Sequence, residues 1–323
     1  MGQVRMDAFP CSNVKVTIGV CVKDCESLIG ETLDGILAQD YPRTLMECIF
    51  VDDGSEDDTL FVIKRYLSKF DIPTKIFHHS WQGLGVSRNI VVDNASGDYI
   101  VWVDGDMTLS PNFVRQQVEF MEKHPTSGIA KGKYCLTVQE NLVSDLENME
   151  FAISNLRRNS ETSSIPLGSG GSIYRVKAIR EVGGFDRNIT GSGEDMDAEQ
   201  RIHKAGWRLN FTSAIFYERR RKTWGSLWKE YVWHGRGFSF LIQRRKQVIN
   251  PFIMFPPVVL KNEILRVVAA YKLTGRKAAL LLPLHYVFRR TAWAIGFASD
   301  CLLKKVNKDL KQKKSAVRES LSL

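Results

Sequence analysis

Hydrophobic residues recur in short runs along the first half of the chain, and these runs alternate with segments of helical periodicity. Apolar runs predict strands at 14–22, 46–53, 74–79, 99–104 and 128–138. Between them, apolar residues spaced by three and four predict helices at 27–39, 60–70, 85–95, 112–124 and 141–159. Strands that alternate with helices and are apolar on both faces predict an α/β fold, Rossmann-like, with a mostly parallel sheet between two layers of helices.

The regular order of strands and helices loosens beyond residue 128. Residues 165–186 are rich in glycine and predict mostly loop, while residues 193–206 predict a helix with acids in its first turns, which suits the helix dipole. The expected organisation is an N-terminal extension at 1–13, the α/β domain at 14–225, a helical, aromatic and basic region at 226–303, and a solvated basic tail at 304–323.

Charge divides the chain into an acidic front and a basic back. Residues 1–200 hold 19 Lys and Arg against 30 Asp and Glu, and residues 201–323 hold 26 against 6. The basic part suits anionic lipid or a phosphorylated substrate, and because no nucleic-acid-binding motif accompanies it, we do not expect nucleic acid as a partner. The six cysteines form no CxxC pair, which predicts reduced thiols, and the first residues do not resemble a signal peptide.

Acidic residues stand where three of the predicted strands end. Asp24 follows the first strand, Asp52 and Asp53 end the second, and Asp104 and Asp106 end the fourth with one glycine between them. Because the carboxyl ends of parallel strands share one edge of the sheet, where ligands bind, we expect these acids to lie close together. Clustered carboxylates at a crevice suit Mg²⁺ or Mn²⁺ beside substrate phosphates. Capping of a helix or turn is the alternative for any single aspartate, and three strand ends together disfavour it.

Four motifs in order resemble the inverting glycosyltransferases of family 2, which use nucleotide sugars and have the GT-A fold. They are VDDGSEDDT at 51–59, VSRN at 86–89, GDYIVWVDGDM at 97–107 and GEDMD at 193–197. The resemblance covers roughly residues 14–240, which makes 14–225 the expected catalytic domain. It implies an enzyme that takes a sugar from a nucleotide-sugar donor and uses Mg²⁺ or Mn²⁺.

The resemblance also implies roles for residues on the donor side. Asp24 and Asp53 would accept hydrogen bonds from the nucleobase and the ribose. Arg88 would approach the base or the diphosphate, unless it is an ordinary surface arginine of its helix. Asp104 would face the ribose and the metal, and Asp106 would bind the metal that bridges the diphosphate and neutralises the leaving nucleoside diphosphate.

On the acceptor side, the aspartate of the family's ED pair is the general base, which here is Asp195. It would take the proton of the acceptor hydroxyl during one inverting displacement. The acceptor or sugar pocket would include Glu194 and three small residues of GSGGS at 168–172, namely Gly170, Gly171 and Ser172. The alternatives are that the ED pair merely complements the helix dipole, as we expect for Asp197 and Glu199, and that the glycines form a flexible loop.

Two departures from the family pattern affect this interpretation. Many relatives carry a metal-binding histidine where this sequence has Glu218, which could bind Mg²⁺ or Mn²⁺ or could instead pair with the arginines at 219–221. The QxxRW signature of processive relatives is absent, and the corresponding region reads HGRGFSF at 234–240, where Arg236 could meet a phosphate. The absence favours transfer of one sugar per encounter.

The most apolar region, 277–305, is divided by Arg289 and Arg290 into two runs too short to span a bilayer, which takes about 20 residues. A helix or hairpin lying in the plane of an anionic membrane surface fits this pattern, and the apolar, proline-containing segment 250–260 could rest there too. A helix packed on the catalytic domain is the alternative. A membrane-facing region suggests a lipid-linked acceptor, such as a glycan on a polyprenyl phosphate.

We therefore expect a metal-dependent, inverting, non-processive glycosyltransferase at the cytoplasmic side of the cell membrane, peripheral or anchored in plane, in the assembly of cell-surface polysaccharide or glycoprotein glycans. A nucleotidyltransferase that makes nucleotide sugars is an alternative, which CVKDCESLIGET at 21–32 disfavours because that class has a glycine-rich, basic signature there. A non-catalytic membrane-surface binding protein is a second alternative, and the full set of acids disfavours it.

Overall fold

A computed structural model describes residues 13–137, 141–156, 162–163, 166–189, 191–245 and 256–320. The N-terminal extension, apart from its last residue, and most of segment 250–260 lie outside the described residues. The chain divides into two compact units. The first comprises Met1–Gln139, Glu147–Thr190 and Glu194–Arg220, and the second comprises Glu140–Leu146, Gly191–Gly193 and Arg221–Leu323.

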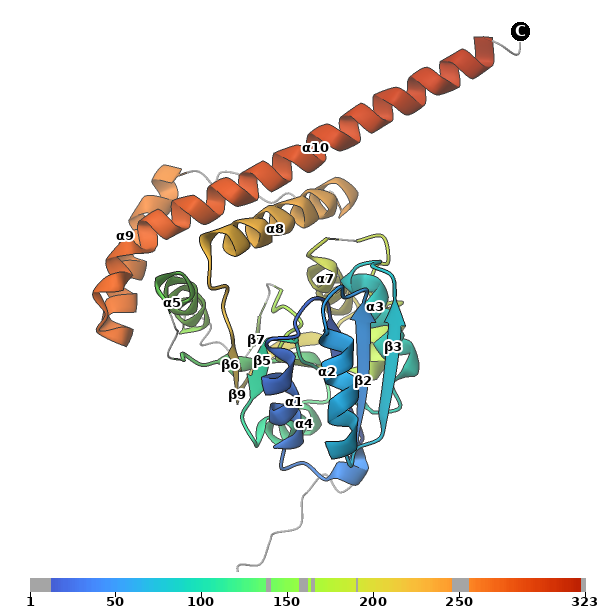
Figure 1. Ribbon diagram of the computed structural model, residues 1–323, viewed down its shortest axis with the longest axis vertical. Helices are drawn as coiled ribbons and strands as arrows, with labels where there is room; N and C mark the ends of the chain where they lie inside the picture. Colours follow the sequence, from blue (N-terminus) through green and yellow to red (C-terminus); the bar gives the residue numbers. More distant parts are fainter. Residues whose placement is uncertain are drawn as a thin grey trace, which may run out of the picture. The chain divides into compact units, whose positions relative to one another are not determined.

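The first unit contains one sheet, with the strand order β3-β2-β1-β4-β8-β6-β9-β5 and with β7 paired to β9 (Figure 1). Its strands are β1 (Val16–Val22), β2 (Met46–Asp53), β3 (Thr74–His79), β4 (Tyr99–Trp102), β5 (Met107–Leu109), β6 (Ser127–Tyr134), β7 (Thr162–Ser163), β8 (Ser172–Arg175) and β9 (Arg208–Glu218). Strands β1 to β4 pair in parallel, as their continuous apolar runs predict. Beyond β4 the sheet is mixed, because β8 runs antiparallel to both β4 and β6 while β6 and β9 are parallel.

Helices cover both faces of the sheet, which confirms the expected α/β class. On one face lie α1 (Ile29–Leu37), α2 (Thr59–Tyr66) and α4 (Phe113–Lys123), whose buried Ile36, Ile63 and Val118 belong to one core cluster. On the other face lie α3 (Leu84–Asn94), α6 (Val176–Glu181) and α7 (Glu194–Lys204), and they contribute to a second cluster. Short 3-10 turns η1 (Arg43–Leu45) and η2 (Leu67–Lys69) and helix α5 (Leu142–Leu156) complete this part of the chain.

The glycine-rich segment 165–186 is more ordered than its sequence indicates. The prediction of mostly loop is wrong for β8 and α6, which together cover residues 172–181. Both elements are short, at four and six residues, so neither displays enough of a period to be recognised beside the surrounding glycines. The central position of β8, between β4 and β6, sets the glycine loop before it directly at the carboxyl end of β4.

The second unit is helical and contains α8 (Trp224–Arg245), α9 (Pro256–Thr274), the 3-10 turn η4 (Lys277–Leu281) and α10 (Leu282–Ser320). Helices α8 and α10 run side by side (Figure 1), and glycines bring their backbones into contact. A Cβ atom on Gly235 would lie 2.0 Å from the carbonyl oxygen of Trp293, and one on Gly296 would lie 2.0 Å from that of Val232.

Among the described residues, no helix combines the length and the hydropathy that a membrane span requires. Helix α10 continues through most of the expected tail at 304–323.

A short segment of the second unit, Gly191–Gly193, packs on α8 immediately before α7 begins. A Cβ atom on Gly237 would lie 2.0 Å from the carbonyl oxygen of Ser192, so this contact also requires glycine. Gly193 has a φ of +103° and lies against Leu241. The glycines of HGRGFSF therefore serve close backbone packing within this unit.

Candidate active site

The acids that follow the first strands meet at one edge of the sheet, as predicted, but Asp53 is occupied with the backbone. The amides of Gln82 and Gly83 donate hydrogen bonds to its two carboxylate oxygens at 2.7 and 2.9 Å, and its side chain is buried. Asp53 thus fixes the loop in front of α3. Each of its carboxylate oxygens already accepts one hydrogen bond, so a nucleoside could use only the second lone pair of each oxygen. Its neighbour Asp52 is also buried and accepts hydrogen bonds from the amide and hydroxyl of Ser55.

Asp24 joins the loops after β1 and β2 while staying half-exposed. Its amide donates to the Ser55 hydroxyl at 3.0 Å, and its carboxylate accepts from the Glu56 amide at 2.8 Å. Its φ of +49° lies in the left-handed region, which non-glycine residues rarely adopt and which occurs at functional sites more often than elsewhere. The geometry leaves an exposed carboxylate at the carboxyl edge of the sheet, where the family resemblance leads us to expect a donor nucleoside.

Asp104 and Asp106 occupy the turn between β4 and β5. The Asp104 side chain is 41% exposed, and one of its oxygens lies 3.7 Å from the Arg88 guanidinium. The Asp106 carbonyl accepts a hydrogen bond from the Arg219 amide, which ties this turn to the end of β9. The turn therefore holds a half-exposed carboxylate beside a buried positive charge.

Arg88 is a buried arginine at the centre of the site and not a surface residue of its helix. It forms a hydrogen-bonded ion pair with Glu194, and its guanidinium carbon lies 5.8 Å from the ring centres of Trp102 and Phe185. Burial alone disfavours its charged form, but the carboxylates of Glu194, Asp195 and Asp104 raise the pKa of Arg88 above its ordinary value. Arg88 thus connects the DxD turn to the start of α7.

Glu194 supports this arrangement from inside the protein. Its side chain is 2% exposed, so it does not reach an acceptor in this conformation. Burial raises the pKa of its carboxyl to about 8, and Arg88 opposes this shift. The adjacent Asp195 is only partly buried, which makes it the member of the pair that a substrate can reach.

The backbone of the glycine loop before β8 holds Asp195. The Ser169 amide donates to one carboxylate oxygen at 3.2 Å, and the Met196 amide donates to the other at 2.7 Å. The Ser169 hydroxyl adds a third contact at 3.4 Å, so hydrogen bonds fix the position of this carboxylate. Asp197 behaves as expected for a structural acid, because it is buried and pairs with Arg201 at 2.8 Å within α7.

The glycine loop at 168–171 also touches the DxD turn. A Cβ atom on Gly170 would lie 2.2 Å from a carboxylate oxygen of Asp104, so a larger residue there would displace that carboxylate. Gly171 has a φ of +71° and lies against the Phe216 ring, and Ser172 is fully buried and donates to the Gly168 carbonyl at 2.7 Å. Gly170 therefore faces the site, while Gly171 and Ser172 shape the loop from behind.

Lys131 on β6 is a member of this site that sequence analysis did not identify. Its buried ammonium donates to the carbonyls of Gly168 and Gly170, on either side of the amide that holds Asp195. Burial lowers the pKa of Lys131, while Glu199 and other nearby carboxylates oppose the shift. The sequence signal is a lysine inside an apolar strand, but the loop that it binds lies 37 to 39 residues away in sequence.

Glu199 is not the simple helix-dipole acid that its sequence position suggests. It is fully buried, and it accepts hydrogen bonds from the Tyr174 hydroxyl at 2.8 Å and from the Leu167 amide. Burial, assisted by Asp195, raises the pKa of its carboxyl to about 7. Glu199 fixes the residue that precedes the glycine loop and places a carboxylate near Lys131.

Glu218 and Arg236 are the two remaining predicted residues. Glu218 ends β9 opposite Met107 and pairs with Arg220 at 2.8 Å, which is the ion pair that the sequence allowed as an alternative to metal binding. Arg236 is exposed on α8, in the second unit. In the described part of the chain, no three side chains among His, Cys, Asp and Glu converge into a ready-made metal site.

The arrangement has the parts of a group-transfer site. A half-exposed carboxylate beside a buried guanidinium suits a cation and an anionic leaving group, and a backbone-held carboxylate suits a general base.

Residues 17–183 match the family described as Glycosyl transferase family 2. The chain belongs to this family. It is a glycosyltransferase. The family match therefore speaks against the two alternatives, a nucleotidyltransferase and a non-catalytic binding protein.

Curated relatives agree with this assignment. EpsE of Bacillus subtilis, a protein named as a glycosyltransferase, is 29% identical over 216 residues, which cover 64% of this chain and 73% of EpsE. The poly-beta-1,6-N-acetyl-D-glucosamine synthase of Staphylococcus epidermidis is 22% identical over 89% of this chain and 70% of that protein. The poly(ribitol-phosphate) beta-N-acetylglucosaminyltransferase TarS of Staphylococcus aureus is 28% identical over 111 residues, and the match spans only 19% of TarS.

Solved structures show the same GT-A fold. The mannosyltransferase PcManGT from Pyrobaculum calidifontis, in complex with GDP-Man and Mn²⁺, has a TM-score of 0.62 at 19% identity, over 90% of this chain and 87% of that one. A complex of TarS residues 1–349 with UDP-GlcNAc has a TM-score of 0.52 at 16% identity, over 88% and 89% of the two chains. The expected fold class is thus confirmed.

Proposed function

We propose that this glycosyltransferase transfers one sugar per encounter from a nucleotide sugar to a lipid-linked acceptor, with inversion and with Mg²⁺ or Mn²⁺. The observation that carries the proposal is the glycine loop, which contacts Asp104 on the donor side and Asp195 on the acceptor side. One short segment thereby sets the spacing between the leaving group and the base. A structural or purely binding protein has no need of that fixed spacing.

Asp195 is the general base of the proposed reaction. It takes the proton from the acceptor hydroxyl as the oxygen attacks the anomeric carbon on the face opposite the diphosphate. The new carbon–oxygen bond forms while the sugar–phosphate bond breaks, and the diphosphate leaves with that electron pair. One displacement of this kind inverts the configuration without a covalent intermediate. Two backbone amides keep the carboxylate aimed at the acceptor throughout.

The residues of the DxD turn fit a divalent metal ion. Asp104 has a half-exposed carboxylate, and Asp106 follows it after one glycine. Mg²⁺ is usually held by one or two carboxylates together with substrate phosphates, which is what such a turn offers. When bound, the ion would supply Lewis-acid stabilisation of the leaving nucleoside diphosphate. Arg88 would add a fixed positive charge from within the protein.

The relatives suggest which donors to test first. PcManGT has been crystallised with GDP-Man and TarS with UDP-GlcNAc, and the Staphylococcus epidermidis relative is named for N-acetylglucosamine transfer. We therefore place UDP-GlcNAc and GDP-mannose at the head of the donor panel. Assembly of a cell-surface polysaccharide or a glycoprotein glycan is the setting that we propose for this activity.

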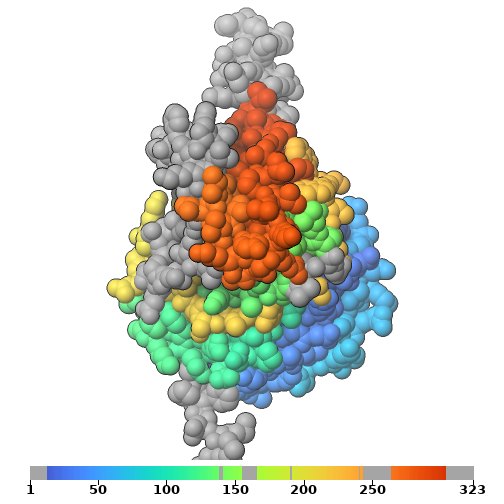
Figure 2. All heavy atoms as spheres, turned by 90° about the vertical axis from the view of Figure 1, so that its left-hand side faces the viewer, coloured from blue at the N-terminus to red at the C-terminus, as the bar shows by residue number. Residues whose placement is uncertain are grey.

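We place the enzyme at the cytoplasmic membrane surface, through its second unit. Figure 2 shows the surface that α9 and the beginning of α10 form in orange, and this region exposes many large apolar side chains. Those on α9 are Ile264, Leu265, Val268, Tyr271 and Leu273. Apolar residues next to a strongly basic sequence are suited to an anionic bilayer surface, where the helices would lie in plane. Flotation with anionic vesicles should succeed at low salt and weaken as salt rises.

Incubation with a panel of nucleotide sugars, with membrane lipid extract as the acceptor source, tests the proposed function. Release of nucleoside diphosphate that requires Mg²⁺ or Mn²⁺ and lipid extract is the expected result, and the Asp195→Asn variant is the matched control. Release from no donor, or equal release by wild type and the variant, would overturn the proposal. Analysis of the product's anomeric configuration tests inversion.

A further inference from the structure

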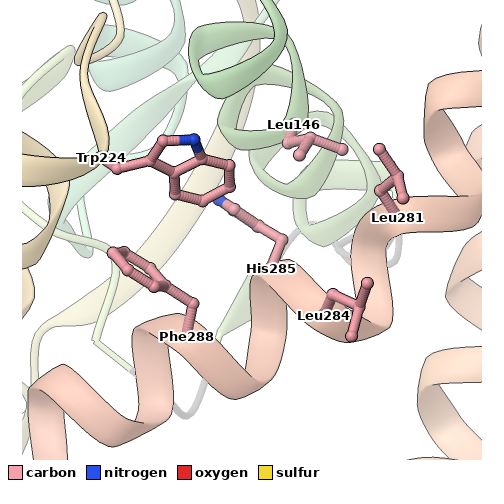
Figure 3. Close-up of a pocket in the computed structure, with 6 residues that line it drawn as sticks. All are labelled: Leu146, Trp224, Leu281, Leu284, His285 and Phe288. Carbon is pink, nitrogen blue, oxygen red and sulfur yellow. The ribbon is translucent and has the colours of Figure 1, made fainter.

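The second unit contains an apolar pocket of about 260 Å³ (Figure 3). Its lining residues are Leu146 at the start of α5, Trp224 at the start of α8, Leu281 of η4, and Leu284, His285 and Phe288 of α10. Trp224 and Phe288 meet edge to face, with ring centres 4.9 Å apart, and the His285 ring lies between α10 and Trp224. The pocket is close to the lower end of the size range of small-ligand sites.

The lining has the composition of a hydrocarbon site. Leu146 and His285 are buried at 1% exposure, whereas Leu284 is 69% exposed at the rim. The pocket is therefore closed at its base and open at one side. Large leucine side chains that remain in water beside an open apolar pocket mark a binding surface.

The rim continues into an apolar stripe that begins in η4 and runs along α10. Its exposed residues are Leu280, Leu284, Val287, Ile295 and Leu302, at successive intervals of four, three, eight and seven residues, which keep them on one face of a helix. A lipid bound with one segment in the pocket would be flanked by this stripe.

Basic residues flank the pocket-lining segment 281–288 in the sequence. Arg276, which precedes η4, is 43% exposed and donates to the Asp145 carboxylate, and Lys277 and Arg290 are exposed. From residue 264 to residue 299 the sequence has no Asp or Glu. An anionic headgroup at this level would meet cations, while the chain attached to it would meet leucine and aromatic side chains.

We propose that this pocket binds the hydrocarbon chain of the acceptor lipid, next to a phosphate held by Arg276 and Lys277. The proposal rests on the proposed function, because it supplies the lipid part of a lipid-linked acceptor. It commits to an apolar chain that carries a phosphate, such as an isoprenoid phosphate, and not to a bulk bilayer lipid.

Calorimetry with the full chain tests this site, with farnesyl phosphate as the probe at concentrations below micelle formation. Farnesol and inorganic phosphate are the comparison ligands. We expect farnesyl phosphate to bind more tightly than either. The double variant Leu281→Gln, Leu284→Gln should weaken its binding by about tenfold or more, since it removes two apolar contacts from exposed positions that do not support the core.

Ile264→Gln is the matched control, because Ile264 is an exposed apolar residue on α9 that does not line the pocket. It should weaken flotation with phosphatidylglycerol vesicles but leave farnesyl phosphate affinity unchanged. Equal affinities in all three proteins, or no preference for farnesyl phosphate over inorganic phosphate, would overturn the proposal. Failure of the donor panel with every acceptor would instead overturn the proposed function, whatever the farnesyl phosphate result.

Discussion

Replacing Gly170 with alanine tests whether the glycine loop sets the geometry of the DxD turn. The new Cβ atom would lie 2.2 Å from the Asp104 carboxylate oxygen, whereas ordinary contacts begin at 3.4 Å. The carboxylate must therefore move by about 1 Å, and a displacement of that size at a reacting group costs roughly 10²-fold in rate. Gly170 lacks a positive φ, so alanine causes no backbone strain. Asp104 is half-exposed and can turn toward solvent, so the fold should survive.

The assay is nucleoside diphosphate release from the best donor of the panel, together with the thermal midpoint of unfolding. We expect the catalytic efficiency, kcat/KM for the donor, to fall by about 10²-fold in Gly170→Ala while the midpoint changes little. Gly225→Ala is the control, because a Cβ atom there meets nothing within 4 Å and its φ is also ordinary. Wild-type efficiency in Gly170→Ala would refute the reasoning, and so would a loss that unfolding fully explains.

Three further substitutions probe the same site. Asp106→Ala should abolish the Mn²⁺-dependent part of nucleoside diphosphate affinity in calorimetry, and unchanged metal dependence would contradict its assignment as a ligand. Asp195→Asn should lose roughly 10²–10⁴ in kcat with normal donor binding, the scale of general-base loss, whereas Asp197→Asn should cost far less; similar losses would leave the base unidentified. Lys131→Met should lower kcat by roughly 10–100-fold at an unchanged donor KM, as for other supporting residues. The exposed lysine two residues further along β6 provides its control, and an equal effect there would exclude a positioning role for Lys131.

The sequence predicted the structure best where the hydrophobic pattern by itself determines the strands. Strands β1, β2 and β4 are largely apolar runs with acids at their carboxyl ends, so both their parallel order and the meeting of Asp24, Asp53 and Asp104 at one edge were predictable. The short strand β8 was not, because four residues do not establish a period. Since β8 is antiparallel to its neighbours, the mixed half of the sheet could not be predicted either.

Buried partnerships explain what else the sequence missed. Arg88 and Glu194 are 106 residues apart, and nothing near either one indicates that they neutralise each other inside the protein. The same holds for Lys131, whose partners are backbone carbonyls and therefore have no side-chain signature. Asp53 differs from these residues because the sequence did single it out, as a ligand of the nucleoside. In the structure, both of its carboxylate oxygens accept hydrogen bonds from backbone amides.

The packing of Gly191–Gly193 on α8 has a consequence for communication along the chain. Gly193 belongs to the second unit, and Glu194, which begins the helix that carries the base, belongs to the first. A single peptide bond therefore separates a segment packed on α8 from the helix that carries the proposed base. We therefore expect a ligand that restrains α8 also to restrain, through this chain connection, the residue that begins α7. By thermodynamic linkage, the coupling is reciprocal, so lipid engagement and donor affinity should each change the other by the same factor.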